Sequence, residues 1–152
     1  AQHDIRIRPG EPGDAATIAA FNRAMARETE GKALDPDVAT AGVRGLFEVP
    51  DRGFYLVAEA GGDVVGSLMV TYEWSDWRDG TFWWIQSVYV EPEHRRRGVF
   101  RALYEDVRNL ARDAEDVCGL RLYVEGENAN AQATYASLGM RPTSYRLYEE
   151  GF

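Results

Sequence analysis

Three arginines and a glycine, Arg95 to Gly98, stand between a predicted strand and a predicted helix. The strand ends at Pro92, and the helix from Gly98 to Ala114 carries an apolar stripe with charged residues opposite. The first turn of a helix leaves backbone N–H groups without intrahelical partners, and its dipole favours negative charge there. Gly98 also lets the backbone approach an oxygen-rich ligand without a Cβ in the way. The junction therefore predicts a site for a phosphate-bearing ligand, although a run of charges is more often a solvated loop.

Net charge singles out the same segment. The 152 residues include 17 Lys and Arg against 25 Asp and Glu, a formal net charge of −8. Residues 91–101 hold four Arg and two Glu, a local charge of +2, so the other residues sum to −10. A basic spot on an acidic chain favours a small polyanion, whereas the overall balance argues against nucleic acid and anionic membranes as partners. The segment has neither the Walker pattern nor the GxGxxG pattern of nucleotide-binding loops.

A second group of chemically useful residues lies in NANAQATYASLG, residues 128–139. Asn128 suits the start of a helix, and Gly139 suits its end. On this helix stands Tyr135, whose phenol has an ordinary pKa of about 10, so it is protonated at pH 7 and can donate a proton. From spacing alone, a half-buried packing aromatic is the more frequent role for such a tyrosine.

The remaining segments predict the elements that hold these two groups in place. Alternating apolar residues, a hairpin signal at Gly61-Gly62-Asp63 and helical spacing predict the order β-α-α-β-β-β-α-β-α-β. We expect strands at 4–9, 54–60, 63–74, 81–92, 119–126 and 144–150, and helices from Asp14 onward and over about 35–47, 98–114 and 128–139. The order predicts a mixed α/β fold with a mostly antiparallel central sheet flanked by helices. The length suits a single domain over residues 1–152.

The small numbers of cysteines and histidines argue against a disulfide-stabilised protein and against a metal-binding protein. The single Cys118 excludes an internal disulfide framework, and we expect it to be a buried structural thiol. His3 and His94 stand far apart, so no metal site is expected. No apolar run approaches the roughly 18 residues of a membrane span, and the first residues show no apolar signal-peptide core. We expect a cytoplasmic protein that does not attach to membranes.

Two motifs together resemble the GCN5-related N-acetyltransferase (GNAT) superfamily, whose members transfer acetyl from acetyl-CoA. Val90-Glu91-Pro92 and Arg95-Arg96-Arg97-Gly98-Val99-Phe100 are similar to the family's V-x-P and Q/R-x-x-G-x-G/A cofactor motif, with Phe100 where the family has Gly or Ala. Asn128, Ala131, Tyr135, Gly139 and Met140 are similar to its N-x-x-A-x-x-x-Y-x-x-x-G-F/M segment. The resemblance runs from about Asp4 to Tyr148 and implies the acyl-CoA N-acyltransferase fold.

The resemblance implies acetyl-CoA as cosubstrate and a tetrahedral intermediate formed by direct attack, with Tyr135 as general acid. Backbone amides of residues 96–101 would hold the pyrophosphate, and the strand end near Val88 would pair with the pantetheine arm and supply the oxyanion donor. The implied cofactor-binding set is Val88, Tyr89, Val90, Arg95, Arg96, Arg97, Gly98, Val99, Phe100, Arg101, Asn128, Ala131 and Tyr135. For the base, three carboxylates (Glu28, Glu30 and Glu73) and deprotonation through water all stay open.

All four tryptophans lie within one predicted hairpin, beside carboxylates. Tryptophans usually serve as core, but at a hairpin mouth they can also cage a cation. The region is weakly similar to the hairpin of diamine acetyltransferases, whose acidic pair aligns here near Gln86-Ser87. We expect a small primary amine as acceptor, with Glu30, Tyr72, Glu73, Trp74, Trp84 and Gln86 on the substrate side. A protein or peptide acceptor and a non-catalytic coenzyme A-binding sensor are the alternatives. A homodimer through this hairpin or the terminal strand is expected by association.

Overall fold

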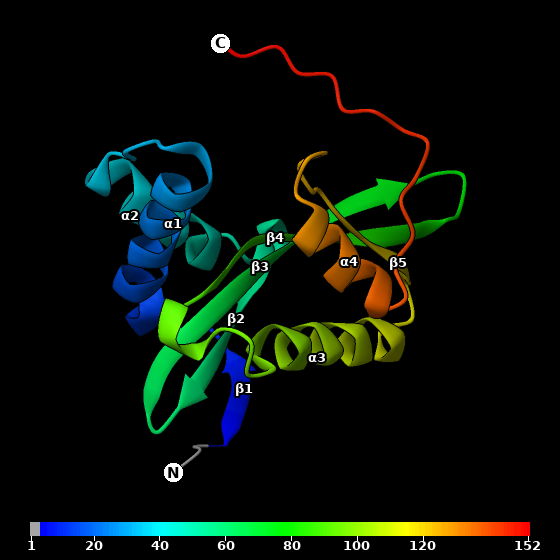
Figure 1. Cartoon of the computed structure of the whole chain (residues 1–152). Coiled ribbons are helices and arrows are strands. Elements are labelled where there is room, and N and C mark those ends of the chain that lie inside the picture. Colours follow the sequence, from blue (N-terminus) through cyan, green and yellow to red (C-terminus); the bar gives the residue numbers. More distant parts are fainter. Residues whose placement is uncertain (1–3) are drawn as a thin grey trace.

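The computed structural model describes residues 4–152 (Figure 1), so His3 lies outside the described part. The strands are β1 (Ile5–Pro9), β2 (Gly53–Ala60), β3 (Asp63–Ser75), β4 (Gly80–Val90) and β5 (Val117–Leu122). The helices are α1 (Ala15–Glu30), α2 (Pro36–Glu48), α3 (Val99–Asp113) and α4 (Ala129–Ser137), with single 3₁₀ turns at Pro12–Asp14, Pro50–Arg52 and Pro92–His94. None of the helices in this described part has both the length and the apolar composition needed to cross a membrane.

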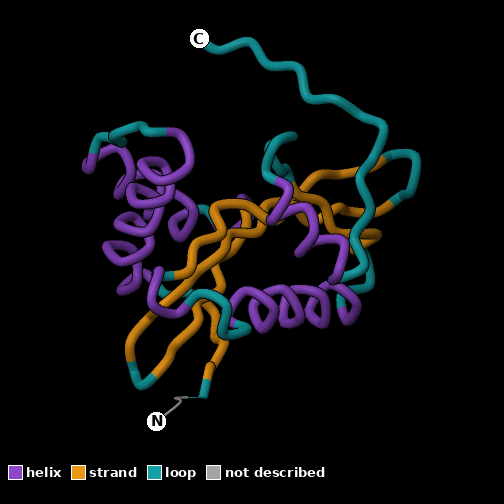
Figure 2. Tube along the Cα trace, viewed as in Figure 1, coloured by secondary structure: helices purple, strands orange, loops and turns teal. Residues whose placement is uncertain are grey.

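Five strands form one mixed sheet in the order β1-β2-β3-β4-β5. Neighbouring strands are antiparallel from β1 to β4, and β5 runs parallel to β4. Helices cover the sheet on both sides, as the tube in Figure 2 shows. The predicted mixed, mostly antiparallel α/β class is confirmed.

Strand β2 explains why helices cover both faces of the sheet. Leu56 and Ala58 belong to the apolar cluster that includes α3, whereas Tyr55 and Val57 belong to the cluster formed with α1 and α2. Successive strand residues point to opposite faces, so the continuous apolar run of β2 buries both. Fully buried helix side chains pack on each face, such as Leu103 of α3 on one and Ile18 of α1 on the other. The sheet is therefore held from both sides and can serve as a rigid base for a site.

Local signals set the helix ends that lie near the site. The Asp35 Oδ1 accepts hydrogen bonds from the N–H groups of Asp37 at 2.8 Å and Val38 at 3.2 Å, and Pro36 takes the first position of α2. Helix α1 ends at Gly31, whose φ of 63° is left-handed and favours glycine. The Gly31 cap fixes where α1 stops, the Asp35 cap fixes where α2 begins, and the last turn of α1 forms part of the site.

The predicted last strand, 144–150, is wrong. Residues 141–152 have no regular secondary structure and leave the body of the protein (Figure 2). The alternation of Tyr145 and Leu147 indicates strand propensity, but a strand also needs a partner edge, and none lies beside this segment in the described structure. Strand β5 is therefore the outer strand among the described strands. Cys118 within it, expected to be buried, is exposed.

Candidate active site

A cleft opens where strands β4 and β5 separate. The two strands pair from Thr81 with Val117 to Ile85 with Leu122, and β4 then continues to Val90 without this neighbour. A hollow of about 1500 Å³ lies here, lined by the free part of β4, by the last residue of β5 and residues 123–125 after it, and by the facing parts of α1, α3 and α4. Ligand pockets for drug-sized molecules measure about 300–1,000 Å³, so this cleft suits a larger ligand.

A β-bulge in β4 coincides with the start of the separation. Met69 of β3 pairs with Gln86, but Ser67 pairs with Tyr89, so Ser87 and Val88 stand opposite one residue. Ser87 has a φ of 52°, in the left-handed region that side chains other than glycine seldom adopt. Bulges of this kind bend a strand and redirect its backbone. The bulge thus turns the end of β4 away from β5 while β3 still satisfies its other edge.

The arginine–glycine junction opens directly into the cleft. Gly98 precedes α3 with a φ of 81°, and Arg96 has a φ of 64°. The first helical hydrogen bond joins Ala102 N–H to Gly98 O at 3.0 Å, so the N–H groups of residues 99–101 lie before it. Arg96 and Arg101 line the cleft beside these amides, whereas Arg97 does not. Together the free amides, the helix dipole and two guanidinium groups can bind a polyanion.

The guanidinium of Arg95 forms its hydrogen bonds with other residues of the protein. Its Nε donates to Val90 O and its Nη2 donates to Glu28 Oε2, both at 2.8 Å, and its guanidinium lies 5.3 Å from the Tyr89 ring centre. The Tyr89 hydroxyl donates to Glu28 Oε1 at 3.1 Å. Arg95 holds the pKa of the Glu28 carboxyl below its usual range, whereas burial, followed by the bond to Glu28, raises the pKa of the Tyr89 phenol. Arg95 therefore ties the junction to α1.

Helix α4 brings Tyr135 to the opposite wall. Asn128 caps the helix through Oδ1, which accepts from Ala131 N–H at 3.1 Å, and the Gln132 amide donates to the carbonyls of Glu125 and Gly126. Tyr135 stands edge-on to Phe100, with ring centres 5.8 Å apart. Burial raises the pKa of the Tyr135 phenol above its ordinary value. Phe100, which stands where the cofactor motif has Gly or Ala, thus packs against the protonated phenol of Tyr135 in the cleft.

The structure gathers most of the predicted site residues in this cleft and leaves others outside it. Lining it are Glu30, Gln86, Val88, Tyr89, Val90, Arg95, Arg96, Gly98, Val99, Phe100, Arg101, Asn128, Ala131 and Tyr135. Four predicted substrate-side residues do not line it: Tyr72, Glu73, Trp74 and Trp84. Two of these four residues bond to each other outside the cleft. The Glu73 carboxylate accepts hydrogen bonds from Arg121 at 2.8 Å and from the Trp84 indole at 3.1 Å, and Trp84 stacks on Tyr123.

Several lining residues carry no local signal in the sequence. Tyr123 and Glu125 follow β5, and Lys32 follows α1. Glu28, predicted only as a candidate base, contacts Arg95 of the junction, although the two residues are 67 positions apart in the chain. These residues meet because separate strands and helices end at the same place in the fold. Motif spacing within one segment does not reveal such a meeting.

Comparison with known proteins agrees with this geometry. Residues 18–140 match the model of the acetyltransferase (GNAT) family. The thialysine N-ε-acetyltransferase of Bos taurus is 30% identical over 147 residues, which cover 89% of this chain and 83% of that protein. A mycothiol acetyltransferase of Kocuria rhizophila is 32% identical over 145 residues, and the chain spans only 45% of its length.

Solved structures share the fold. A possible acetyltransferase from Clostridium difficile 630 is 49% identical, with a TM-score of 0.91 and 97% of both chains covered. A predicted acetyltransferase from Clostridium acetobutylicum, solved with acetyl-CoA, is 14% identical with a TM-score of 0.78, covering 97% of this chain and 96% of that one. The second likeness concerns the fold alone. The predicted resemblance to the GNAT superfamily is confirmed.

The bulge at Ser87 yields a first prediction. Valine is β-branched and strained at positive φ, so Ser87→Val should lower the free energy of unfolding by about 1–3 kcal/mol and weaken coenzyme A binding. Ser87→Gly is the matched control, because glycine adopts this φ at no steric cost and should keep both properties. Urea unfolding and calorimetric titration with coenzyme A measure the two effects. Unchanged coenzyme A affinity in Ser87→Val would contradict the role of the bulge in shaping the cleft.

Proposed function

The chain belongs to the acetyltransferase (GNAT) family, and from this premise we propose that it transfers the acetyl group of acetyl-CoA to the primary amine of a small molecule. One observation carries the proposal: the end of β4, open on the edge that faces away from β3, lines the same cleft as the arginine-flanked start of α3 and the buried phenol of Tyr135. This arrangement supplies a phosphate site, a backbone edge and an acid in one continuous space.

In the proposed complex, acetyl-CoA lies along the free edge of β4. Its pyrophosphate accepts from the first-turn amides of α3, with Arg96 and Arg101 beside it. Its pantetheine arm extends the sheet by pairing with the backbone of residues 88–90, in the way an added strand would. Arg95 supports this contact indirectly, because its bonds to Val90 O and Glu28 hold the loop against α1.

Transfer begins when the neutral amine nitrogen attacks the thioester carbonyl carbon. The carbonyl oxygen becomes an oxyanion, which the N–H of Val88, at the bulge, stabilises. Collapse of this intermediate breaks the C–S bond, and the departing sulfur takes the proton of the Tyr135 hydroxyl. The products are an N-acetyl amide and coenzyme A. The proton lost by the amine passes to a base and then to solvent, and the Tyr135 phenolate takes a proton back from solvent.

The three candidate bases differ in their surroundings. Arg95 lowers the pKa of Glu28, which makes it a weaker base, and both of its oxygens already accept hydrogen bonds. Glu73 is bound by Arg121 and Trp84 outside the cleft. Glu30 lines the cleft and is exposed to solvent. We assign deprotonation of the acceptor to Glu30, acting through water.

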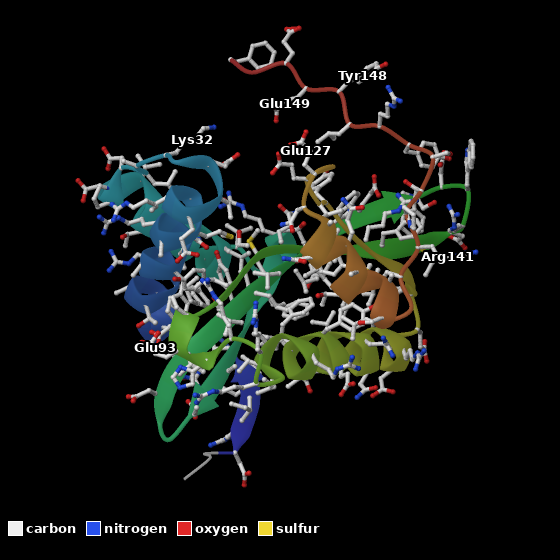
Figure 3. All side chains as sticks on the ribbon, viewed as in Figure 1. Lys32, Glu93, Glu127, Arg141, Tyr148 and Glu149 are labelled. Atoms are coloured by element: carbon white, nitrogen blue, oxygen red, sulfur yellow. The ribbon has the colours of Figure 1, made fainter. Side chains whose placement is uncertain are left out.

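The acceptor is assigned to the end of the cleft opposite the arginine junction. Glu30 and Glu125 line the cleft together with Lys32. In Figure 3, Lys32 and Glu127 lie toward one end of the molecule, while Glu93, just before the junction, lies toward the other. Carboxylates on the cleft wall attract a cationic amine before it loses its proton. A small amine also agrees with the name of the relative from Bos taurus, which acetylates thialysine. The exposed Cys118 thiol suits a reducing compartment, so we place the reaction in the cytoplasm.

The acceptor assignment predicts the outcome of a thiol-release screen. Small primary amines should release coenzyme A thiol from acetyl-CoA faster than peptides do, and Glu125→Gln should raise KM for a cationic amine about 2- to 5-fold, as expected for an exposed charge pair. Glu127→Gln is the matched control, because it removes a charge from the same loop at a residue that does not line the cleft. Its KM should not change. Release with peptides alone would overturn the assignment, and release with no acceptor would favour the sensor alternative.

The acid assignment makes a separate prediction. Tyr135→Phe should lower kcat by about 10²- to 10⁴-fold, the usual contribution of a general acid, with the Kd for acetyl-CoA nearly unchanged. Tyr123→Phe removes another phenol that lines the cleft and should keep its kcat. Because burial raises the pKa of Tyr135, the acid stays protonated past its ordinary pKa of about 10. The rate should therefore rise with pH as the amine deprotonates, with no fall below about pH 10. Equal kcat in Tyr135→Phe would remove it as the acid.

A further inference from the structure

A single lysine, Lys32, lines the cleft. Of the 17 Lys and Arg residues in the sequence, all the others are arginine. A guanidinium stays protonated in proteins and cannot act as a nucleophile, whereas a lysine amine that has lost its proton can. Among the Lys and Arg side chains, Lys32 alone can therefore accept an acetyl group, and it lines the space assigned to acetyl-CoA.

The end of α1 holds the backbone of Lys32, which directly follows Gly31 (Figure 3). Gly31 N–H donates to Arg27 O at 3.1 Å, and Lys32 N–H donates to Ala26 O at 3.2 Å. The bond from Gly31, at its left-handed φ of 63°, is a common way for a helix to end. Lys32 is exposed to solvent, and its four-carbon stem is flexible. The amine of Lys32 is thus attached at a fixed point and can move within the cleft.

The groups that acetyl transfer needs line the same cleft as Lys32. Glu30, proposed above as the base, is the last residue of α1 and stands two positions before Lys32. The phenol of Tyr135 and the strand backbone at Val88 complete the set. An amine that is tethered beside a thioester reacts at a far higher effective concentration than a free one. The Lys32 side chain also ends in a primary alkylamine, the chemical class proposed for the free acceptor.

We propose that the protein acetylates its own Lys32 when no free amine occupies the cleft, an inference that rests on the proposed acetyl-transfer function. The Lys32 ammonium loses a proton to Glu30 through water, and the neutral nitrogen attacks the thioester carbonyl carbon. The N–C bond forms, the C–S bond breaks, and the departing sulfur takes the Tyr135 hydroxyl proton, which solvent replaces. A second proton leaves the nitrogen for solvent. The product is a neutral acetamide, so the modification removes one positive charge from the cleft.

Intact mass spectrometry of the full chain, incubated with acetyl-CoA and no acceptor, tests this proposal. The native chain should gain the mass of one acetyl group, and peptide mapping should place that group on Lys32. Lys32→Arg keeps the positive charge and should gain no acetyl group. The matched control, Lys32→Arg with Arg44→Lys, moves the single lysine to an exposed position on α2 that does not line the cleft, and it should gain none either. Acetylation confined to other groups, or equal acetylation at position 44, would overturn the proposal.

A mixing experiment separates transfer within one chain from transfer between chains. Transfer within one chain is first order, so the fraction of native chain modified in a given time should not change when the protein is diluted. A tagged Tyr135→Phe chain should gain acetyl at the same rate with and without untagged native chain. Faster acetylation of the tagged chain when native chain is added, or a fraction modified that falls on dilution, would overturn transfer within one chain.

Small amines distinguish a failure of this inference from a failure of the proposed function. A saturating small primary amine should suppress acetylation of Lys32, because both nitrogens compete for one thioester. Thiol release with the same amine reports the proposed function separately. An unmodified Lys32 in a chain that still acetylates small amines would overturn this inference alone. If neither Lys32 nor any small amine is acetylated, the proposed function is overturned with it.

Discussion

The short parallel pairing between β4 and β5 is the constraint on which the rest of the site depends. Pairing from Thr81 to Ile85 fixes the two strands side by side, and the bulge at Ser87 then turns β4 away. Unpaired backbone groups within a protein are costly unless something satisfies them. Strand β3 satisfies one edge of β4, and the helices hold both faces of the sheet, so the remaining edge can stay open for a ligand. The packed sheet and helices around Ser87 hold its backbone at this strained positive φ.

Charged side chains of both signs line the cleft. The junction before α3 concentrates Arg96, Arg101 and helix-terminal amides, and Glu30 and Glu125 also line the cleft. The net charge of −8 therefore conceals a local basic segment, residues 91–101, within an acidic molecule. Arg95 also lines the cleft, but Glu28 and Val90 O hold its guanidinium. Its charge stabilises the loop rather than the ligand, and as a consequence Glu28 is a weak base.

The features that the sequence predicted are local ones. The start of α3 at Gly98, the cap at Asp35 and the position of Tyr135 on α4 each depend on residues within one segment, so their spacing predicts them. The bulge at Ser87 depends on the register between β3 and β4, and no residue type announces it. The contact of Glu28 with Arg95 joins residues far apart in the chain. The terminal strand failed for a related reason: propensity at Tyr145 and Leu147 does not say where a partner edge lies.

Amide hydrogen exchange with and without acetyl-CoA tests the central claim most directly, because the claim assigns the ligand to named backbone amides. Peptides that contain residues 87–90 and residues 96–101 should exchange more slowly when acetyl-CoA is bound, while those from β1 and α2 should not change. Protection confined to the hollow between β5 and α3, or unchanged exchange at both segments with saturating acetyl-CoA, would contradict the assignment of the open edge of β4 as the binding surface.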